Sequence, residues 1–258
     1  PDSVGGMAID RMCASGLMSI ATAAKGIMTG EMDIAVAGGL ESISLVQNKH
    51  KNSYRSQSAS VLQASPTAYI QMIETAEIVS RRYNISRSAQ DDYALRSQQR
   101  VAAAQAAGLY AGEIVPLTTS KQLFDKEGNV TGSEEVTLRQ DEGNRADTTL
   151  ESLTALKPVI EGGLVTAGNA SGVNDGAAAV LLASEVAATR QGLTPRARVV
   201  GMATAGVAPR TMGIGPVPAV QKVLAQTGLS LAQMDIIELN EAFAAQGLAV
   251  LRDLGLAD

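Results

Sequence analysis

Two apolar runs of strand length enclose a helix-patterned segment in the first 40 residues, and this order constrains the fold more than any other feature of the chain. Residues 3–12 hold the first run, and residues 33–39 ("DIAVAGG") hold the second, which ends in two glycines. A helix closed by Gly30 is predicted between them, with four side chains at core-facing spacing: Leu17, Ile20, Ala21 and Ala24. Strand, helix and strand together predict a βαβ unit, and therefore a parallel sheet covered by helices.

The middle of the chain, residues 43–158, has a different character and is predicted to leave the sheet as an insertion. It begins with a polar, loop-like stretch and continues with two predicted helices, one over residues 66–83 and one from Ser86, a suitable N-cap, to Gly108. The stretch "LFDKEGNVTG" then has the pattern of a hairpin.

The order of strands and helices returns in the last third of the chain. An apolar strand is predicted over residues 177–182, and Pro195 marks a linker. Two further strands are predicted at 197–206 and 234–240, each followed by a helix, so one α/β plan occurs twice. The chain stops directly after a helix, where the pattern requires another strand, and we therefore expect it to be a fragment.

Charge and composition argue against several classes of function. The net charge is −5 with no basic block, which is not the pattern of a nucleic-acid-binding protein. No apolar run reaches the length of a membrane span, and the opening "PDSVGG" does not have the pattern of a signal peptide. A single cysteine allows no internal disulfide and fits a reducing compartment, and the single histidine, His50, allows no multi-histidine metal site. Only 3% of the residues are aromatic and none is Trp, so we expect an aliphatic core packed closely around Ala and Gly.

Cys13, the only cysteine, lies where the first predicted strand ends and the following helix begins. Backbone N–H groups at a helix start and the positive end of the helix dipole stabilise an anion, and so favour the nucleophilic thiolate. A turn from strand to helix is also a recurrent position for a nucleophile. Free cysteine is, however, among the most buried residue types, so position alone leaves two interpretations open, a nucleophile or a small apolar core side chain.

Four stretches carry a resemblance to a known family: "DRMCASGLMSI", "DIAVAGGLESIS", "VTAGNASGVNDGAAAVLL" and "MDIIELNEAFAAQ". In this order, across residues 10–246, they resemble the thiolases, which make or cleave the carbon–carbon bond of 3-oxoacyl-coenzyme A. The resemblance implies an α/β fold, a duplicated βα sandwich with an inserted α+β loop domain, here incomplete at both termini. It divides the chain into a partial N-terminal domain at 1–42 and 159–194, a loop domain for CoA and substrate at 43–158, and a partial C-terminal domain at 195–258.

The same resemblance implies catalytic roles for two residues. Cys13 matches the acyl-accepting cysteine, which attacks a thioester carbonyl and forms an acyl-enzyme. Asn240 matches an asparagine that holds a water molecule and so helps to form an oxyanion hole. By spacing alone, the better explanation of Asn240 is an N-cap of the helix that follows, and that alternative stays open.

Six further residues match positions that bind substrate or coenzyme A in the family: Arg145, Ser171, Met72, Met212, Ala242 and Phe243. Arg145 corresponds to an arginine that packs against the nucleotide end, and Ser171 to a serine beside the pantetheine arm. The two methionines match positions near the acyl pocket, and Ala242 and Phe243 match positions that line the thioester pocket. Surface charge, turn formation and core packing are the ordinary explanations of these residue types. No metal and no covalently bound cofactor is expected, and coenzyme A or acyl-CoA enters as a substrate.

The positions at which the chain departs from the family pattern are as informative as those at which it matches. Residues 71–73 read "QMI" where well-studied biosynthetic thiolases have His-Met-Gly, which argues against acetyl-CoA specificity. The family's Gly-His-Pro histidine, which activates the nucleophile, and its second cysteine, which moves the substrate proton, are expected after Asp258, and its first βα elements before Pro1. His50 lies in the polar stretch "NKHKN" and does not match that histidine. We therefore expect the 258-residue chain by itself to be inactive.

The predicted function is that of a thiolase-type acyltransferase of fatty acid metabolism and β-oxidation, which cleaves 3-oxoacyl-CoA with coenzyme A or catalyses the reverse Claisen condensation. Two alternatives stay open: a β-ketoacyl synthase relative, against which "NEAFA" argues, and a non-catalytic thiolase-like protein that binds CoA or lipid. The expected partners are acyl-CoA substrates, further copies of the chain in a dimer or tetramer, and a β-oxidation partner subunit. The expected location is the bacterial cytoplasm or an organellar matrix.

Overall fold

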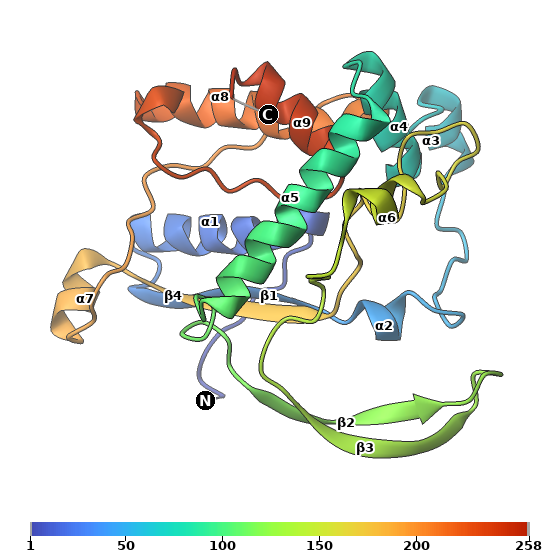
Figure 1. The fold of residues 1–258 in the computed structure, drawn as a ribbon. Coiled ribbons are helices and arrows are strands. Elements are labelled where there is room, and N and C mark those ends of the chain that lie inside the picture. The colour runs from blue at the N-terminus through green and yellow to red at the C-terminus, as the bar shows by residue number, and fades with distance from the viewer. Residues whose placement is uncertain (1, 257–258) are drawn as a thin grey trace. The chain divides into compact units, whose positions relative to one another are not determined.

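The computed structural model describes residues 2–256 (Figure 1). The chain divides into two compact units. The first unit comprises Pro1–Tyr69, Val173–Val207 and Gly215–Ile237, and the second comprises Ile70–Gly172, Ala208–Ile214 and Glu238–Asp258. The boundaries of these two units differ from those of the three domains expected from the sequence, and the three-domain division stays a prediction. Its outermost residues, 1, 257 and 258, lie outside the described residues.

The first unit joins a two-stranded sheet to several helices. Its elements, in chain order, are η1 (Met12–Ala14), α1 (Ser15–Met28), β1 (Ile34–Glu41), α2 (Ile43–Val46), α3 (Ala59–Ala64), β4 (Gly176–Ala183), α7 (Glu185–Arg190), α8 (Pro216–Thr227) and η3 (Leu231–Gln233). The helix predicted to follow residues 197–206 is confirmed as α8.

β1 and β4 pair antiparallel along their whole length, with Ile34 opposite Ala183 at one end. The strands approach each other closely at Gly38, where an added Cβ would lie 2.4 Å from the carbonyl oxygen of Ala178. A side chain at position 38 would therefore force the two strands apart, which explains why glycine occupies this position in the middle of a strand.

The parallel sheet expected from the sequence is wrong for the part of the chain that the structure describes. The strands expected at 33–39 and 177–182 form β1 and β4, whereas those expected at 3–12, 197–206 and 234–240 are not formed. A strand needs a partner for its backbone N–H and C=O groups. β1 takes that partner from β4, which follows the insertion, and not from the segment before α1, and the β1–β4 pair is antiparallel.

α1 covers the sheet with its small side chains. Ala21 and Ala24 are buried, as the helical spacing predicts, and Gly30 follows the helix with a φ of +76°. The prediction is wrong for Leu17, whose side chain is 75% exposed, and Ile20 is only partly buried. Because neighbouring strands lie about 5 Å apart, a two-stranded sheet covers only a narrow stripe of a helix, and Leu17 lies outside it.

The second unit is built from helices and one hairpin. Its elements are α4 (Met72–Arg82), α5 (Arg87–Ala106), β2 (Leu117–Phe124), β3 (Val130–Leu138), α6 (Leu150–Thr154), η2 (Pro209–Ile214) and α9 (Ala244–Asp253). The two helices and the hairpin predicted in the middle of the chain are confirmed as α4, α5 and the β2–β3 pair.

Local sequence signals account for the ends of these elements. Ser86 caps α5 as predicted, because its Oγ accepts a hydrogen bond from the backbone N–H of Ala89 at 3.1 Å. In the hairpin turn, Asp125 Oδ1 accepts a hydrogen bond from the backbone N–H of Asn129 at 2.7 Å, and Gly128 adopts a φ of +85° that favours glycine.

The core of the second unit is aliphatic. Val79, Ile85, Leu248 and Ala249 form one buried cluster. Four partly buried residues pack against that cluster: Tyr83, Ala89, Tyr93 and Ile214. Burial of one leucine or isoleucine side chain contributes about 1.5–3 kcal/mol, so this cluster supplies much of the stability of α4, α5 and α9. The buried apolar side chains of residues 2–256 are all Ala, Val, Leu or Ile, which confirms the expectation from the scarcity of aromatic residues.

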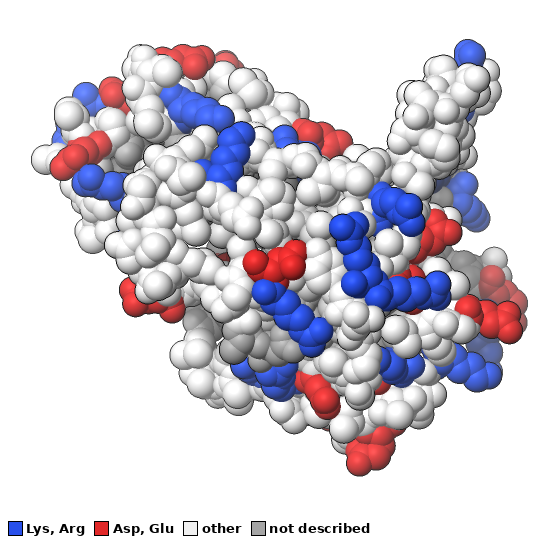
Figure 2. All heavy atoms as spheres, turned by 90° about the horizontal axis from the view of Figure 1, so that it is seen from above, with Lys and Arg blue, Asp and Glu red and all other residues white. Residues whose placement is uncertain are grey.

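Two observations describe the surface. Across the described residues, no helix combines the length and the apolar character that a lipid bilayer requires of a spanning segment. On the face shown in Figure 2, Lys and Arg side chains lie interspersed with Asp and Glu side chains. That face therefore does not present a field of a single sign.

Candidate functional site

Cys13 lies on a short turn that leads into α1. The turn, η1, begins after Arg11 and contains Met12 in the left-handed region, with a φ of +50° that is uncommon for a residue other than glycine. The Cys13 side chain is a free, exposed thiol. Of the two interpretations left open by the sequence, the buried apolar side chain is therefore wrong, and an accessible sulfur remains.

Hydrogen bonds between close neighbours hold this turn, which we call the Cys13 elbow (residues 10–15). The backbone N–H of Met12 donates to Asp10 Oδ1 at 2.9 Å, and the backbone N–H of Arg11 donates to Ser15 Oγ at 2.8 Å. Ser15 Oγ in turn donates to the carbonyl oxygen of Met12 at 2.7 Å. These bonds satisfy backbone groups at the helix start and keep Met12 in its unusual conformation, so they project Cys13 into solvent.

The second and third of the four motifs, "DIAVAGGLESIS" and "VTAGNASGVNDGAAAVLL", are joined by hydrogen bonds at one end of the β1–β4 sheet. Ser44, which follows β1, donates to Asp175, which precedes β4: the backbone N–H reaches Oδ1 at 2.9 Å and Oγ reaches Oδ2 at 2.5 Å. The hydroxyl of Ser44 and then its backbone N–H hold the pKa of the Asp175 carboxyl below its usual value. This charge-assisted clamp ties the loop that enters β4 to the end of β1.

In the second unit, the third motif, "VTAGNASGVNDGAAAVLL", also forms a short antiparallel contact with the fourth, "MDIIELNEAFAAQ". The backbone N–H of Ser171 donates to the carbonyl oxygen of Ala242 at 2.9 Å, and the N–H of Ala244 donates to the carbonyl oxygen of Asn169 at 2.9 Å. Ala170 and Phe243 are paired in the resulting bridge. The structure thus brings together three of the predicted substrate-binding residues, Ser171, Ala242 and Phe243.

A buried polar network holds the loop that carries Ala170 and Ser171, one of the two segments of this bridge. Asn169 is 2% exposed; its Oδ1 accepts from the backbone N–H of Thr166 at 2.8 Å, and its Nδ2 donates to Asp91 Oδ1 at 2.9 Å. Asp91, also buried, is paired with Arg87 at 2.7 Å. Arg87 Nη2 extends the network to the carbonyl oxygens of Leu153 and other residues at the end of α6. Sequence reasoning did not single out Asn169, although it belongs to the motif "AGNASG".

Asn240 is exposed and does not cap a helix. α9 begins at Ala244, and its N-cap position is occupied by Phe243, whose backbone is extended at φ −146° and ψ 141°. The capping explanation of Asn240 is therefore wrong. The bridge with Ala170 keeps the chain extended up to Phe243 and so delays the start of the helix.

The remaining predicted residues lie in the second unit at separate, accessible positions. Arg145 is exposed, and its backbone N–H donates to Gln98 Oε1 of α5 at 2.8 Å. Met72 opens α4 and is 40% exposed, and Met212 lies in η2 and is 41% exposed. α4 and η2 pack against each other, so Met72 and Met212 lie on two neighbouring elements of the second unit.

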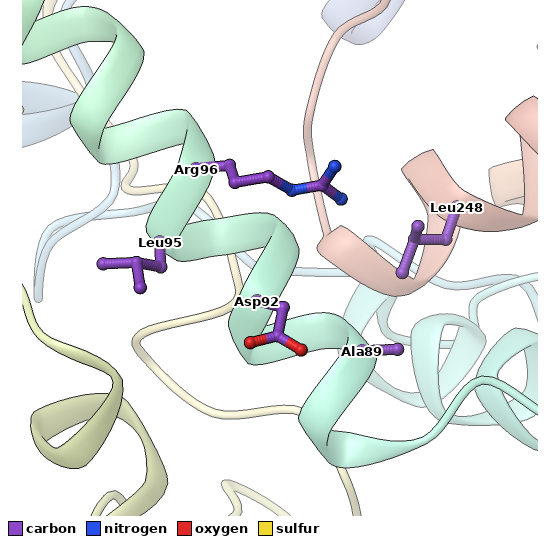
Figure 3. Close-up of a pocket in the computed structure, with 5 residues that line it drawn as sticks. All are labelled: Ala89, Asp92, Leu95, Arg96 and Leu248. Carbon is purple, nitrogen blue, oxygen red and sulfur yellow. The ribbon is translucent and has the colours of Figure 1, made fainter. Parts of the chain in front are cut away.

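A hollow of about 490 Å³ lies between α5 and α9 (Figure 3). It is lined by Ala89, Asp92, Leu95, Arg96 and Leu248, none of which is a predicted site residue. In Figure 3, Arg96 extends from α5 toward the segment that leads into α9. Because Leu248 belongs to the core cluster, we interpret this hollow as a surface groove between two packed helices rather than as the substrate site.

Comparison with known proteins covers almost the whole chain. A family model described as "Thiolase, N-terminal domain" matches residues 1–186, and one described as "Thiolase, C-terminal domain" matches residues 193–258. A β-ketoadipyl-CoA thiolase of Pseudomonas putida is 50% identical over 273 aligned residues, which take in 100% of this chain and 66% of the relative.

Solved structures show the same likeness. The crystal structure of the Bacillus anthracis acetyl-CoA acetyltransferase matches with a TM-score of 0.85 and 41% identity, over 100% of this chain and 65% of that one. Human mitochondrial 3-ketoacyl-CoA thiolase in complex with CoA matches with a TM-score of 0.80 and 41% identity, over 96% of this chain and 62% of that one. The chain thus spans slightly less than two thirds of the length of these relatives.

Proposed function

The chain belongs to the thiolase family, and from that premise we propose that the protein is an acyltransferase that moves an acyl group to or from coenzyme A through an acyl-enzyme on Cys13. The observation that carries the proposal is the exposed thiol of Cys13 on the Cys13 elbow, the turn with a left-handed Met12 that leads into α1. Strained turns of this kind present a nucleophile clear of its neighbouring side chains.

In the proposed thiolytic direction, the Cys13 thiolate attacks the C3 carbonyl of a 3-oxoacyl-CoA. The bond between C2 and C3 then breaks, the acyl group stays on the sulfur, and the enolate of acetyl-CoA takes up a proton and leaves. The thiol of a second coenzyme A loses its proton as it attacks the acyl-cysteine, which releases acyl-CoA and restores the Cys13 thiolate. The Claisen condensation is the same sequence of steps in reverse.

Asn240 serves the step in which the carbon–carbon bond forms or breaks. Negative charge develops there on the thioester oxygen of the enolate, and a water molecule held by the Asn240 amide donates a hydrogen bond to it. Such a donor typically stabilises a transition state by roughly 2.7–4 kcal/mol. The exposed side chain of Asn240, which no helix uses as a cap, supports this role.

Coenzyme A is bound by residues of the second unit. Ser171 lies beside the pantetheine arm, Ala242 and Phe243 line the thioester pocket, and the 2.9 Å bond that joins Ser171 to Ala242 supports a shared binding surface. Arg145, exposed and anchored to α5, contacts the nucleotide end. The complex of a human relative with CoA is in line with this choice of ligand. Coenzyme A acts as substrate, and no further cofactor is part of the proposal.

The proposed acyl group is longer than acetyl. Met72 and Met212 adapt their flexible thioethers to this group, and both are partly exposed. The Pseudomonas putida relative is named for a β-ketoadipyl substrate, whereas the Bacillus anthracis structure is of an acetyl-CoA acetyltransferase at lower identity. Gln71 and half-buried Ile73 flank Met72, where a smaller glycine would leave a different pocket shape.

Family membership supports a proposal for the assembly and the location of the protein. We expect a homo-oligomer, a dimer or tetramer, that acts in the cytoplasm or an organellar matrix, with a β-oxidation partner subunit as a further candidate. Light scattering of the intact protein measures its oligomeric state directly.

The decisive experiment is intact-mass measurement after incubation of the whole protein with a short acyl-CoA. The wild type is expected to gain one acyl group, and the Cys13→Ser variant none, because a serine hydroxyl is far less acidic than a thiol. The variant should bind coenzyme A and unfold like the wild type, since Cys13 is exposed. An adduct that survives the substitution contradicts the role of Cys13. CoA binding without any adduct on the wild type supports the non-catalytic alternative.

A further inference from the structure

Glu241, the residue next to Asn240, is bonded to α5. Ser97 Oγ donates to Glu241 Oε2 at 2.5 Å, and the Tyr93 hydroxyl also hydrogen-bonds to this carboxylate. Ser97 and Tyr93 lie one turn apart on the same helix, so their two hydroxyls face the same way. Hydrogen bonds to an ionised acceptor are roughly twice as strong as neutral ones, so this double contact is a firm attachment for an exposed side chain.

Tyr93 is a rigid member of this contact. Its ring packs against the core cluster, and an added Cβ at Gly247 would lie 2.9 Å from its hydroxyl oxygen, so the tyrosine lies directly against α9. Burial, then the negative charge of Glu241 and the hydrogen bond to it, raise the pKa of Tyr93 above its ordinary value. The hydroxyl therefore stays protonated and remains a donor to Glu241.

Among the described residues, the hydrogen bonds that hold the segment around Asn240 lie on its C-terminal side. From Ala242 onward the backbone is fixed by the bridge to residues 169–171, and Glu241 is fixed by α5. Asn240 itself is exposed and, among the described residues, has no side-chain hydrogen bond. Its position thus depends on the residue that follows it, whose Cα is 3.8 Å away across one peptide bond.

We propose that Glu241 is a positioning residue, which holds the Asn240 amide in place through Ser97 and Tyr93 during formation and cleavage of the carbon–carbon bond. The inference rests on the proposed function, in which Asn240 carries the oxyanion water. Catalytic donors need placement within about 0.5 Å, and a misplacement of about 1 Å can lower a rate by about 10²-fold. Loss of the Glu241 attachment would permit such a shift without disturbing the buried core.

The test compares steady-state kinetics of variants of the whole protein on one 3-oxoacyl-CoA. Glu241→Ala is expected to lower kcat about 10-fold or more with KM within about twofold, since it displaces a donor used mainly in the transition state. Glu241→Gln should retain most of the activity, because its amide oxygen still accepts from both hydroxyls. The matched control is Glu238→Ala, which removes another exposed carboxylate, two residues before Asn240, and should leave kcat unchanged.

A double-mutant cycle separates positioning from a merely structural effect. If Glu241 acts through Asn240, then Glu241→Ala has no further effect on kcat in an Asn240→Ala background. Additive losses, or a Glu241→Ala enzyme with normal kcat, overturn the inference. If Glu241→Ala does not fold, the double variant Ser97→Ala, Tyr93→Phe takes its place in the same cycle. A normal kcat for Asn240→Ala contradicts instead the role of Asn240 in the proposed function, and acyl-enzyme formation on Cys13 is scored separately by mass.

Discussion

The Cys13 elbow is held by hydrogen bonds between residues no more than four positions apart, whereas the loop that carries Ser171 is held by residues from distant parts of the chain. Asp10 and Ser15 close the elbow within a single turn at the surface. Asn169 and Asp91, in contrast, are buried and separated by 78 positions. The difference shows that one chain can hold the proposed nucleophile through local hydrogen bonds and part of the proposed binding surface through long-range packing.

The largest expected effect tests the long-range side of this comparison. Arg87→Ala leaves the Asp91 carboxylate, only 1% exposed, without its cation and removes the donor to the end of α6. Breaking a buried pair in this way typically costs about 3–5 kcal/mol, so we expect a loss of that size in the free energy of unfolding, measured by urea denaturation. The reactivity of the Cys13 thiol toward an alkylating reagent in native buffer should stay that of the wild type.

A matched control for this variant exists in the first unit. Arg190 pairs with Asp33 at 3.4 Å, and both side chains are more than half exposed. Arg190→Ala is therefore expected to cost less than about 1 kcal/mol. Equal losses for the two variants would show that the network around Asn169 is no more important than a surface ion pair.

The next effect concerns activity rather than stability and tests Asn240. Asn240→Asp removes the amide donor and places a negative charge near developing negative charge, so turnover of a 3-oxoacyl-CoA by the whole protein should fall by roughly 10²-fold. Because Asn240 is exposed and caps no helix, the melting temperatures of Asn240→Asp and Asn240→Ala should both match that of the wild type. Near-normal turnover with unchanged melting would contradict the proposed catalytic role of Asn240.

The smallest expected effect tests the clamp between Ser44 and Asp175 in the first unit. Since the folded state lowers the pKa of Asp175, its contribution to stability is present above the ordinary aspartate pKa of about 3.9 and is lost as the pH falls through the lowered value. Ser44→Ala should therefore melt slightly below the wild type near pH 7, and the difference should shrink toward about pH 3. Asp175→Asn, which cannot titrate, serves as the control without this pH dependence. A difference that grows on acidification contradicts the clamp.

The sequence alone was sufficient for the features that depend on near neighbours. The N-cap at Ser86, the hairpin turn at Asp125–Asn129 and the helix closed by Gly30 all follow from interactions within a few residues. The family motifs likewise identified the chain, because each is a short run of specific residue types in a set order. The helix that follows Cys13 was predictable from its local pattern, whereas the exposure of the Cys13 thiol was not.

Only the tertiary structure decided which segments pair and which side chains are covered. β1 pairs with β4 across the whole insertion and is antiparallel, the strands expected at 197–206 and 234–240 find no ladder partner among the described residues, and Leu17 stays exposed. Asn240 does not cap α9, because the bridge between Ala170 and Phe243 keeps the chain extended and the helix begins only at Ala244. Strand pairing and burial join residues far apart in the chain, and local patterns carry no record of which distant segment becomes the partner.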